Sequence, residues 1–316
     1  MPMLDVPAYL SRLGVDHPAP PSVAGLRALH RAHCERVAYE NLDIQLGRPT
    51  SIDPYQSAAR VRSGRGGYCY HLNGAFSALL GCLGYQVRWH RGGVQRLGQP
   101  QPPGANGNHL ALTVHGLPAP ECPDGVWMVD VGLGDGPHEP LPLRPGSYRQ
   151  GPFRYRIERS AVVAGGWRFT HDTAGSFAGM DFAPEVAGPD DFTAMHRHLS
   201  TSPDSAFVRV AIVQRRGPAG SYALRGCRLI RVGGAGRSDE DIDRARDWYA
   251  AIADTFGLAL DDVGPRDRER LWRRVRGAHE AWVASEAAAR SAGSGPGPTG
   301  GVGAVAAGVA ATCQAG

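Results

Sequence analysis

Hydrophobic residues in the first part of the chain recur at helical spacing. Ser22 can cap a helix whose apolar positions begin at Val23. Residues 72–83 repeat the three- and four-residue spacing more clearly, and Gly84 ends them. We therefore predict that residues 1–84 form a helical part of the fold.

The spacing changes after residue 84. Apolar and polar residues alternate at 110–114 and again at 153–157, and glycine and proline separate these short runs. Alternation is typical of strands that bury one face, and the turns between them favour antiparallel pairing. We predict an antiparallel β-barrel over residues 85–190.

The third part of the chain mixes both patterns. Residues 207–213 and 222–232 have the composition of strands, with a turn at 217–220 between them. Because helical patterns follow these strands, we predict a mixed α/β part over residues 191–290.

The two helices of this third part have recognisable beginnings. Ser238 and Asp241 resemble the capping box of the first helix, and Pro265 suits the first turn of the second. Residues 291–316 are rich in glycine and alanine and carry almost no charge. Such a segment cannot bury enough apolar surface to order itself, so we predict a disordered tail.

The composition is that of a globular protein, and it argues against a nucleic-acid-binding protein and a membrane protein. Of the 316 residues, 42% are hydrophobic and 20% are charged, and the net charge of +4 is spread without a basic block. We therefore expect no nucleic-acid partner. No apolar run reaches the roughly 20 residues that span a bilayer, and the N-terminus lacks the features of a signal peptide. We expect no membrane attachment and a cytoplasmic location.

The six cysteines are widely spaced and form no Cys-x-x-Cys pair. This spacing argues against disulfides and against a cysteine zinc site, and we expect no bound metal. The thiols are then either small core residues or reactive groups.

One cysteine follows a pair of glycines at the start of a predicted helix. The segment reads Arg65-Gly66-Gly67-Tyr68-Cys69. Unpaired N–H groups at a helix N-terminus stabilise a thiolate, and they can also donate to the oxyanion that forms when the thiolate attacks a thioester. Cys69 is therefore a candidate nucleophile; the alternative is a small buried core residue.

A thiolate needs a base, and the base needs a group that orients it. Alternation puts His109 on the strand face opposite Leu110, so His109 need not fill the core. Asp130 lies within an apolar strand, where an ionised carboxylate is costly unless it is paired. Taken alone, His109 could be a structural histidine, and Asp130 could bond to the amides of residues 132–134.

Pairing of the two strands would bring His109 and Asp130 together. If Val114 lies opposite Gly125 in a hairpin, antiparallel counting places His109 opposite Asp130 on one face. The carboxylate would then fix the imidazole tautomer, which completes a Cys69–His109–Asp130 set. The long loop does not fix the register, so this pairing is a hypothesis.

Four segments resemble the arylamine N-acetyltransferase family. The family's nucleophile motif is Arg-Gly-Gly-x-Cys-x-Glu-x-Asn, and its aspartate motif is Asp-Val-Gly-Phe-Gly. An N-terminal pattern and the opening of the family's third domain also match, and order and spacing agree over about residues 1–285. The matching segments are residues 29–33 with 39–43, 65–73, 130–134 and 200–207.

The resemblance implies a helical bundle, a β-barrel and an α/β lid, with a cysteine-proteinase-like core of Cys69, His109 and Asp130. It also implies a ping-pong reaction. Cys69 takes an acetyl group from acetyl-CoA, and a small aromatic amine then takes it from the acyl-cysteine. Acetyl-CoA is a co-substrate in this scheme and no cofactor stays bound. No motif identifies the residues that bind coenzyme A.

His71 departs from the family, which has glutamate at this position. The change removes a carboxylate that could pair with Arg65. One interpretation is that the residues around position 71 repack and the enzyme stays fully active. The other is that the change alters the substrate or weakens the enzyme. Relatives of this fold act as amide synthases that take the acyl group from an acyl carrier protein, and that alternative stays open. So does a non-catalytic or hydrolytic relative.

Two smaller expectations concern the first part of the chain. His30 and His33 are spaced for one helix face, but without a third nearby ligand they are more typical of structural residues than of a metal site. Glu40 is expected to pair with Arg12 and hold the helical part together.

Overall fold

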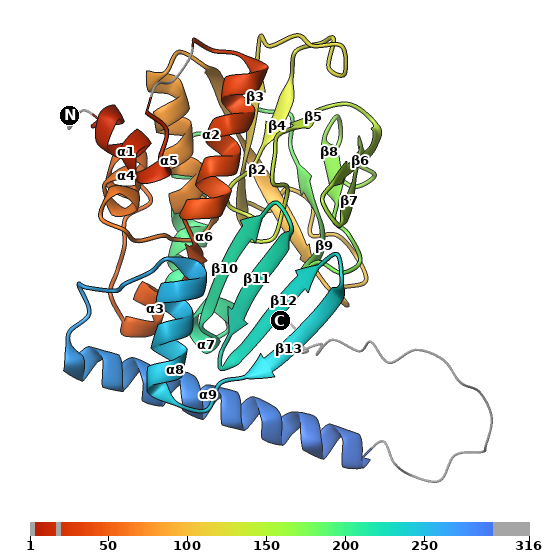
Figure 1. The fold of residues 1–316 in the computed structure, drawn as a ribbon. Coiled ribbons are helices and arrows are strands. Elements are labelled where there is room, and N and C mark those ends of the chain that lie inside the picture. The colour runs from red at the N-terminus through yellow and green to blue at the C-terminus, as the bar shows by residue number, and fades with distance from the viewer. Residues whose placement is uncertain (1–3, 17–19, 293–316) are drawn as a thin grey trace, which may run out of the picture.

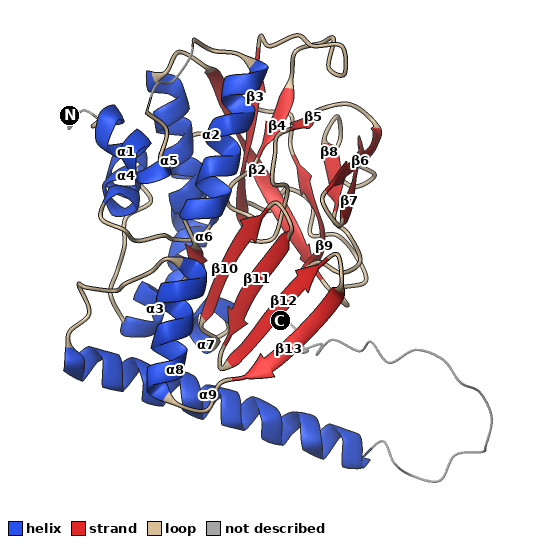
Figure 2. Ribbon diagram, viewed as in Figure 1, coloured by secondary structure: helices blue, strands red, loops and turns tan. Residues whose placement is uncertain are grey.

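The chain folds into a cluster of helices, a nearly closed eight-stranded sheet and a five-stranded sheet (Figure 1). The structure, a computed structural model, describes residues 4–16 and 20–292. Helices gather beside the sheets, and one long helix runs below the five-stranded sheet (Figure 2). The predicted α+β fold of helical bundle, barrel and α/β part is confirmed.

The helices of the first 84 residues are α1 (Val6–Leu13), α2 (Val23–Arg36), α3 (Leu42–Leu46), α4 (Pro54–Arg62) and α5 (Cys69–Cys82). Ser22 caps α2 as predicted, since its hydroxyl accepts a hydrogen bond from the Gly25 amide at 3.1 Å. Helix α5 is buried along most of its length, and Phe76 and Leu80 contribute to the core that the helices share. A buried α5 gives its first residue a fixed position.

The eight-stranded sheet is antiparallel and encloses an apolar interior that includes Met128, Phe153 and Phe169. Strand β3 has two buried faces: Leu110 and Leu112 belong to the helical core, whereas Ala111 belongs to the barrel interior. In spatial order the strands are β5 (Leu141–Pro142), β4 (Trp127–Val129), β3 (His109–His115), β2 (Gln86–Arg96), β9 (Phe177–Phe182), β8 (Trp167–Thr170), β7 (Phe153–Arg159) and β6 (Gly146–Gln150).

The five-stranded sheet combines segments from distant parts of the chain. In spatial order its strands are β1 (Tyr39–Glu40), β10 (Ile212–Gly217), β11 (Gly220–Arg225), β12 (Arg228–Gly233) and β13 (Gly236–Asp241). Strand β1 also forms a parallel bridge between Tyr39 and Gly67. The sheet of the third part therefore lies beside the segment that leads to Cys69.

Helices of the third part complete the fold. They are α6 (Asp190–Thr201), α7 (Ala206–Arg209), α8 (Ala245–Ala250) with the π-helical turn Ala251–Thr255, and α9 (Pro265–Ala292). Trp248, Ile252 and Leu271 pack with Val213 and Leu229 in one core between these helices and the five-stranded sheet.

Two strand predictions in the third part are wrong in detail. Residues 207–209 are helical because the Ser205 hydroxyl caps α7, accepting a hydrogen bond from the Phe207 amide at 3.1 Å. Residues 222–232 form a hairpin and not one strand. The turn lies at Gly226, whose φ of +59° favours glycine.

The predicted capping box is also wrong. Ser238 and Asp241 lie in β13, because the turn from Gly233 to Gly236 returns this segment along β12. The polar residues of this segment suit either a capping box or an edge strand. They form a strand because the segment pairs with β12 in a hairpin.

Helix α9 begins at Pro265 as predicted and continues through Ala292. The predicted tail from residue 293 to 316 lies outside the described residues. The domain limits at residues 84, 190 and 290 stay predictions. Within the described ranges, no helix has the length and apolar character needed to cross a membrane.

Candidate active site

Cys69 is the first residue of α5 and is buried. The preceding residue, Tyr68, is extended and gives the first turn no side-chain cap. The amides of His71 and Leu72 bond to the Tyr68 carbonyl, which leaves the amides of Cys69 and Tyr70 outside the helical hydrogen bonds. The predicted position of Cys69 at a helix N-terminus is confirmed.

His109 and Asp130 are in direct contact. Nε2 of His109 lies 2.7 Å from Oδ2 of Asp130, and only 2% of each residue is exposed. Since the carboxylate accepts, Nε2 carries a proton, and the other ring nitrogen, Nδ1, is left for the Cys69 thiol, the second side-chain partner of His109. The structure thus brings together the three side chains that the sequence singled out.

The predicted strand register is wrong by two residues. Val114 lies opposite Trp127, not Gly125, so Asp130 is a diagonal neighbour of His109 and not its direct partner. A shift of two residues keeps a side chain on the same face of a sheet. The contact between His109 and Asp130 survives for this reason.

The charges around His109 favour its protonated form. Burial alone would lower the pKa of His109, but Asp130 and then Cys69 oppose this effect and raise it to about 10. A protonated imidazole stabilises a thiolate next to it. Burial dominates at three other cysteines: it raises the pKa of Cys34 to about 12, that of Cys227 to about 11 and that of Cys122 above its usual value. Cys34 lies 3.6 Å from Nδ1 of His30, but that imidazole is neutral and does not stabilise a thiolate.

Asp130 is held from three sides. Its Oδ1 accepts hydrogen bonds from Asn73 Nδ2 at 2.8 Å and from the Gly132 amide at 2.9 Å. Its own amide donates to His30 Nε2 at 3.2 Å. The carboxylate therefore makes both contacts that the sequence left as alternatives, to His109 and to a glycine amide.

His30 is a structural residue, as its sequence pattern suggested, but the sequence did not reveal its partners. Its Nδ1 donates to the His138 carbonyl at 3.0 Å while its Nε2 accepts from Asp130, so both ring nitrogens are occupied. Burial lowers the pKa of His30 to about 4, which keeps the ring neutral. His33 bonds to Tyr9 at 3.0 Å. The histidine motif thus connects α2 to the Asp130 segment, one hundred residues away, and a contact so distant has no local signal.

Gly132 allows the Asp130 segment to approach the start of α5. A Cβ atom at this position would lie 2.8 Å from Cys69 Cα and 2.9 Å from Asn73 Nδ2. No side chain fits between them, so glycine is required by close approach.

Substitution of Gly132 with alanine should separate the thiol from its partners. We expect Gly132→Ala to lower the free energy of unfolding by about 1–3 kcal/mol, as overpacking does, and to reduce acyl transfer further than unfolding explains. Thermal unfolding and initial rates at a temperature where the protein is folded measure the two effects. Gly188→Ala is the matched control, because its Cβ would meet nothing within 4 Å. Equal activity of the two variants would contradict the close approach.

The residue that departs from the family lies away from the triad. His71 is buried, and its Nε2 contacts Thr50 Oγ1 at 3.1 Å. Burial, with smaller contributions from Arg60 and His196, holds the pKa of His71 well below its usual value, so the ring is neutral. It neither joins Cys69–His109–Asp130 nor adds a charge beside them.

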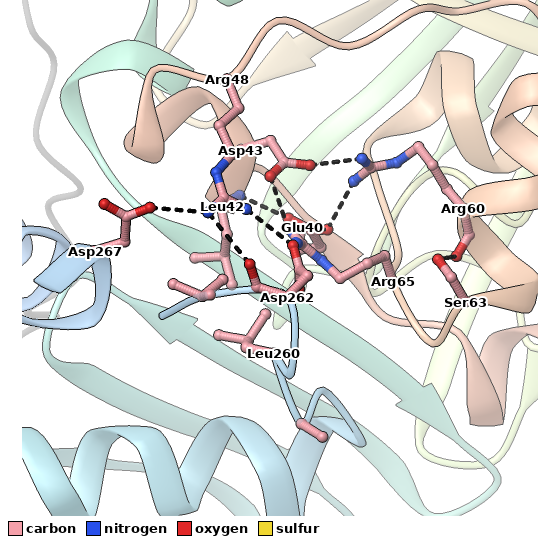
Figure 3. A network of polar contacts seen from close by, with 12 residues as sticks. Glu40, Leu42, Asp43, Arg48, Arg60, Ser63, Arg65, Leu260, Asp262 and Asp267 are labelled. Atoms are coloured by element: carbon pink, nitrogen blue, oxygen red, sulfur yellow. Dashed lines mark hydrogen bonds and ion pairs between the residues drawn. The ribbon is translucent and has the colours of Figure 1, made fainter. Parts of the chain in front are cut away.

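Arg65 pairs with carboxylates that lie outside the helix of His71 (Figure 3). Its guanidinium lies 3.1 Å from Asp43, 3.3 Å from Glu40 and 2.7 Å from Asp262. The expected pair of Glu40 with Arg12 is wrong: the buried Glu40 carboxylate lies beside Arg60, at 3.2 Å, and Arg65. The sequence identified neither arginine as the partner of Glu40, because Arg60 lies 20 residues and Arg65 lies 25 residues further along the chain.

Comparison with known proteins agrees with this site. A family described as N-acetyltransferase matches residues 22–264. An arylamine N-acetyltransferase from Mycolicibacterium smegmatis is 31% identical over 278 residues, which cover 84% of this chain and 95% of that protein. The solved structure of Mycobacterium marinum arylamine N-acetyltransferase in complex with CoA is 29% identical, has a TM-score of 0.75, and is matched over 86% of this chain and 98% of its own.

A relative with a different name matches part of the chain. Proansamycin X synthase from Amycolatopsis mediterranei is 29% identical over 164 residues, which cover 50% of this chain and 59% of that protein. The long matches and the family model lead to one conclusion: the chain is an acyltransferase that belongs to the arylamine N-acetyltransferase family.

Proposed function

We propose that this N-acetyltransferase transfers an acetyl group from acetyl-CoA to a small aromatic amine through an acetyl-Cys69 intermediate. One observation carries the proposal: the thiol at the N-terminus of α5 adjoins an imidazole whose Nε2 lies 2.7 Å from a buried carboxylate. The names of the relatives, and the CoA complex of one of them, support the choice of donor and acceptor.

In the first half-reaction the Cys69 thiolate attacks the thioester carbonyl of acetyl-CoA. The new carbon–sulfur bond forms, and the amides at the start of α5 donate to the oxyanion. The bond to the sulfur of coenzyme A then breaks, and His109 gives its Nδ1 proton to the departing thiolate. Acetyl-Cys69, free coenzyme A and a neutral imidazole remain.

In the second half-reaction the amine attacks acetyl-Cys69 while His109 removes its proton. The carbon–sulfur bond breaks, the amide product leaves, and the thiolate and imidazolium are restored. Acylation helps this step, because the thioester carries no negative charge and so no longer raises the pKa of His109. The imidazole is then more readily neutral and able to act as the base. Asp130 holds the tautomer throughout.

Initial rates test this order of events. With acetyl-CoA and an aminobenzoate varied together, a ping-pong route predicts parallel lines in double-reciprocal plots. Intersecting lines would contradict an acyl-enzyme, because they require both substrates to bind before the first product leaves.

A second candidate is an amide synthase that uses the same triad with an acyl-carrier-bound donor. The partial match to proansamycin X synthase favours it. Acylation of Cys69 by an acyl carrier protein, with none by acetyl-CoA, would select this candidate. A reactive Cys69 that hydrolyses its acyl group in the presence of amines would instead indicate a hydrolytic relative.

A further inference from the structure

The loop that presents Cys69 is held by a cluster of buried charges. We call residues 65–68 the nucleophile loop. Arg60 Nε donates to the Gly66 carbonyl at 3.2 Å, and the Glu40 amide donates to the Gly67 carbonyl at 2.9 Å. A Cβ on Gly66 would lie 1.9 Å from the Ala38 carbonyl oxygen, so the loop has little room to move on this side.

The side chains of this cluster alternate in charge (Figure 3). Asp43 lies between Arg60, at 2.5 Å, and Arg65, at 3.1 Å. The exposed fractions of the Glu40, Asp43 and Arg65 side chains are 1%, 8% and 7%. Buried charges of this kind depend on one another, since each loses much of its stabilisation when a partner moves.

The last member of the cluster comes from the other end of the chain. Asp262 Oδ2 accepts hydrogen bonds from Arg65 Nη1 at 2.7 Å and from Arg48 Nη1 at 2.9 Å. Arg48 also bonds to Asp267 in the first turn of α9, at 3.0 Å. No other acceptor within the described ranges bonds to Nη1 of Arg65, because Glu40 and Asp43 both face Nη2.

The segment that carries Asp262 is held in an unfavourable backbone conformation. Leu260 has a φ of +56°, and among the residues that the structure describes it is the one non-glycine residue in this region. Arg268 stabilises the turn by donating to the carbonyls of Leu260, at 2.7 Å, and Val263, at 2.9 Å. Strain of this kind persists only where surrounding contacts maintain it, and it is found at functional positions.

The ion pair between Asp262 and Arg65 is poorly explained by a contribution to folding stability alone. The Asp262 side chain is 46% exposed, and ion pairs with such exposure contribute little to the free energy of folding. Its position matters more, because Arg65 is four residues before Cys69 and begins the nucleophile loop.

We propose that Asp262 is a positioning residue for the Cys69 nucleophile, acting through Arg65 on the nucleophile loop. The segment before α9 thereby sets the distance between the thiol and His109, although it touches neither. This inference rests on the proposed function only in taking Cys69 as the nucleophile.

Asp262→Ala tests the inference, with Asp261→Ala as its matched control. Asp261 is the adjacent acid, is exposed, and makes no hydrogen bond or ion pair with the described residues, so both variants lose one negative charge from the same turn. Small displacements at a reacting group are costly, and we expect Asp262→Ala to react with iodoacetamide about tenfold more slowly at neutral pH. The pH dependence of alkylation should also move to more alkaline pH. Asp261→Ala should behave as wild type.

Asp262→Asn should recover part of the rate, because its amide oxygen can still accept from Arg65 and Arg48. All rates are measured well below the melting temperature of each variant, so that loss of folded protein does not contribute. Alkylation of Asp262→Ala with the rate and pH profile of Asp261→Ala would overturn the positioning role. Because alkylation needs no acetyl-CoA, a failure of the positioning role can be told apart from a failure of the proposed function, which is tested separately by acetylation of wild-type Cys69.

Discussion

Replacing Cys69 with serine should lower the rate of acetyl transfer by about 10⁴-fold or more while the fold stays intact. A hydroxyl is a much weaker acid than a thiol, so His109 cannot hold it as an anion in the ground state. Serine is slightly smaller and polar, and it fits the buried first turn of α5. The measurement is kcat/KM for release of coenzyme A in the presence of an aromatic amine.

Cys82→Ser is the control for this variant. Cys82 is the last residue of the same helix and is exposed, so its replacement should leave the rate unchanged. If Cys69→Ser kept a rate near that of wild type, another residue would have to be the nucleophile, and the proposed mechanism would be wrong.

Replacing Asp130 with asparagine should cost about 10³- to 10⁴-fold in kcat/KM, the range seen when a triad carboxylate is lost. The Asn73 side chain and the Gly132 amide both donate to Oδ1, so the asparagine oxygen should take that position and its NH₂ group should face His109. Nε2 of His109 would then have to accept a hydrogen bond. The proton would move to Nδ1, which faces Cys69, and the neutral ring could not act as the base.

Asp130→Asn should also change how the alkylation rate of Cys69 depends on pH, in a direction that follows from the pKa of His109. The carboxylate opposes burial and raises the pKa of His109 to about 10, so its loss should lower that pKa. Alkylation of Cys69 at neutral pH should then slow, because the imidazolium that stabilises the thiolate loses its proton at lower pH than in wild type. Asp181→Asn, which removes a buried carboxylate from the barrel, controls for general destabilisation. Equal rates for the two variants at neutral pH would contradict the role of Asp130.

The candidate site could be predicted from sequence because its parts have local signals. Two glycines before a clean apolar helix place Cys69 at a helix N-terminus, and strand alternation excludes His109 from the helical core. Register had no such signal. Residues 117–125 contain their own turn between Ala119 and Cys122, and their length leaves the pairing of Val114 undetermined. The prediction that His109 and Asp130 share one face of the sheet was still correct, because a register error of two residues leaves each side chain on the same face.

The contacts around the site could not be predicted because they depend on the tertiary fold. The amide of Asp130 bonds to His30 on α2, and Arg65 bonds to Asp262 near the start of α9. Each pair joins residues at least 100 positions apart, and many acids and histidines could have taken the same places. The wrong pairing of Glu40 with Arg12 shows this limit, since charge alone does not select among the arginines of the chain.

Mass spectrometry of the intact protein tests the central claim most directly. The protein is exposed briefly to acetyl-CoA without an amine, with Cys69→Ala treated in parallel. The proposed mechanism predicts one added acetyl group, absent from Cys69→Ala and discharged when an aminobenzoate is added. An unmodified wild-type protein, or an acetyl group that persists in Cys69→Ala, would contradict an acetyl-Cys69 intermediate.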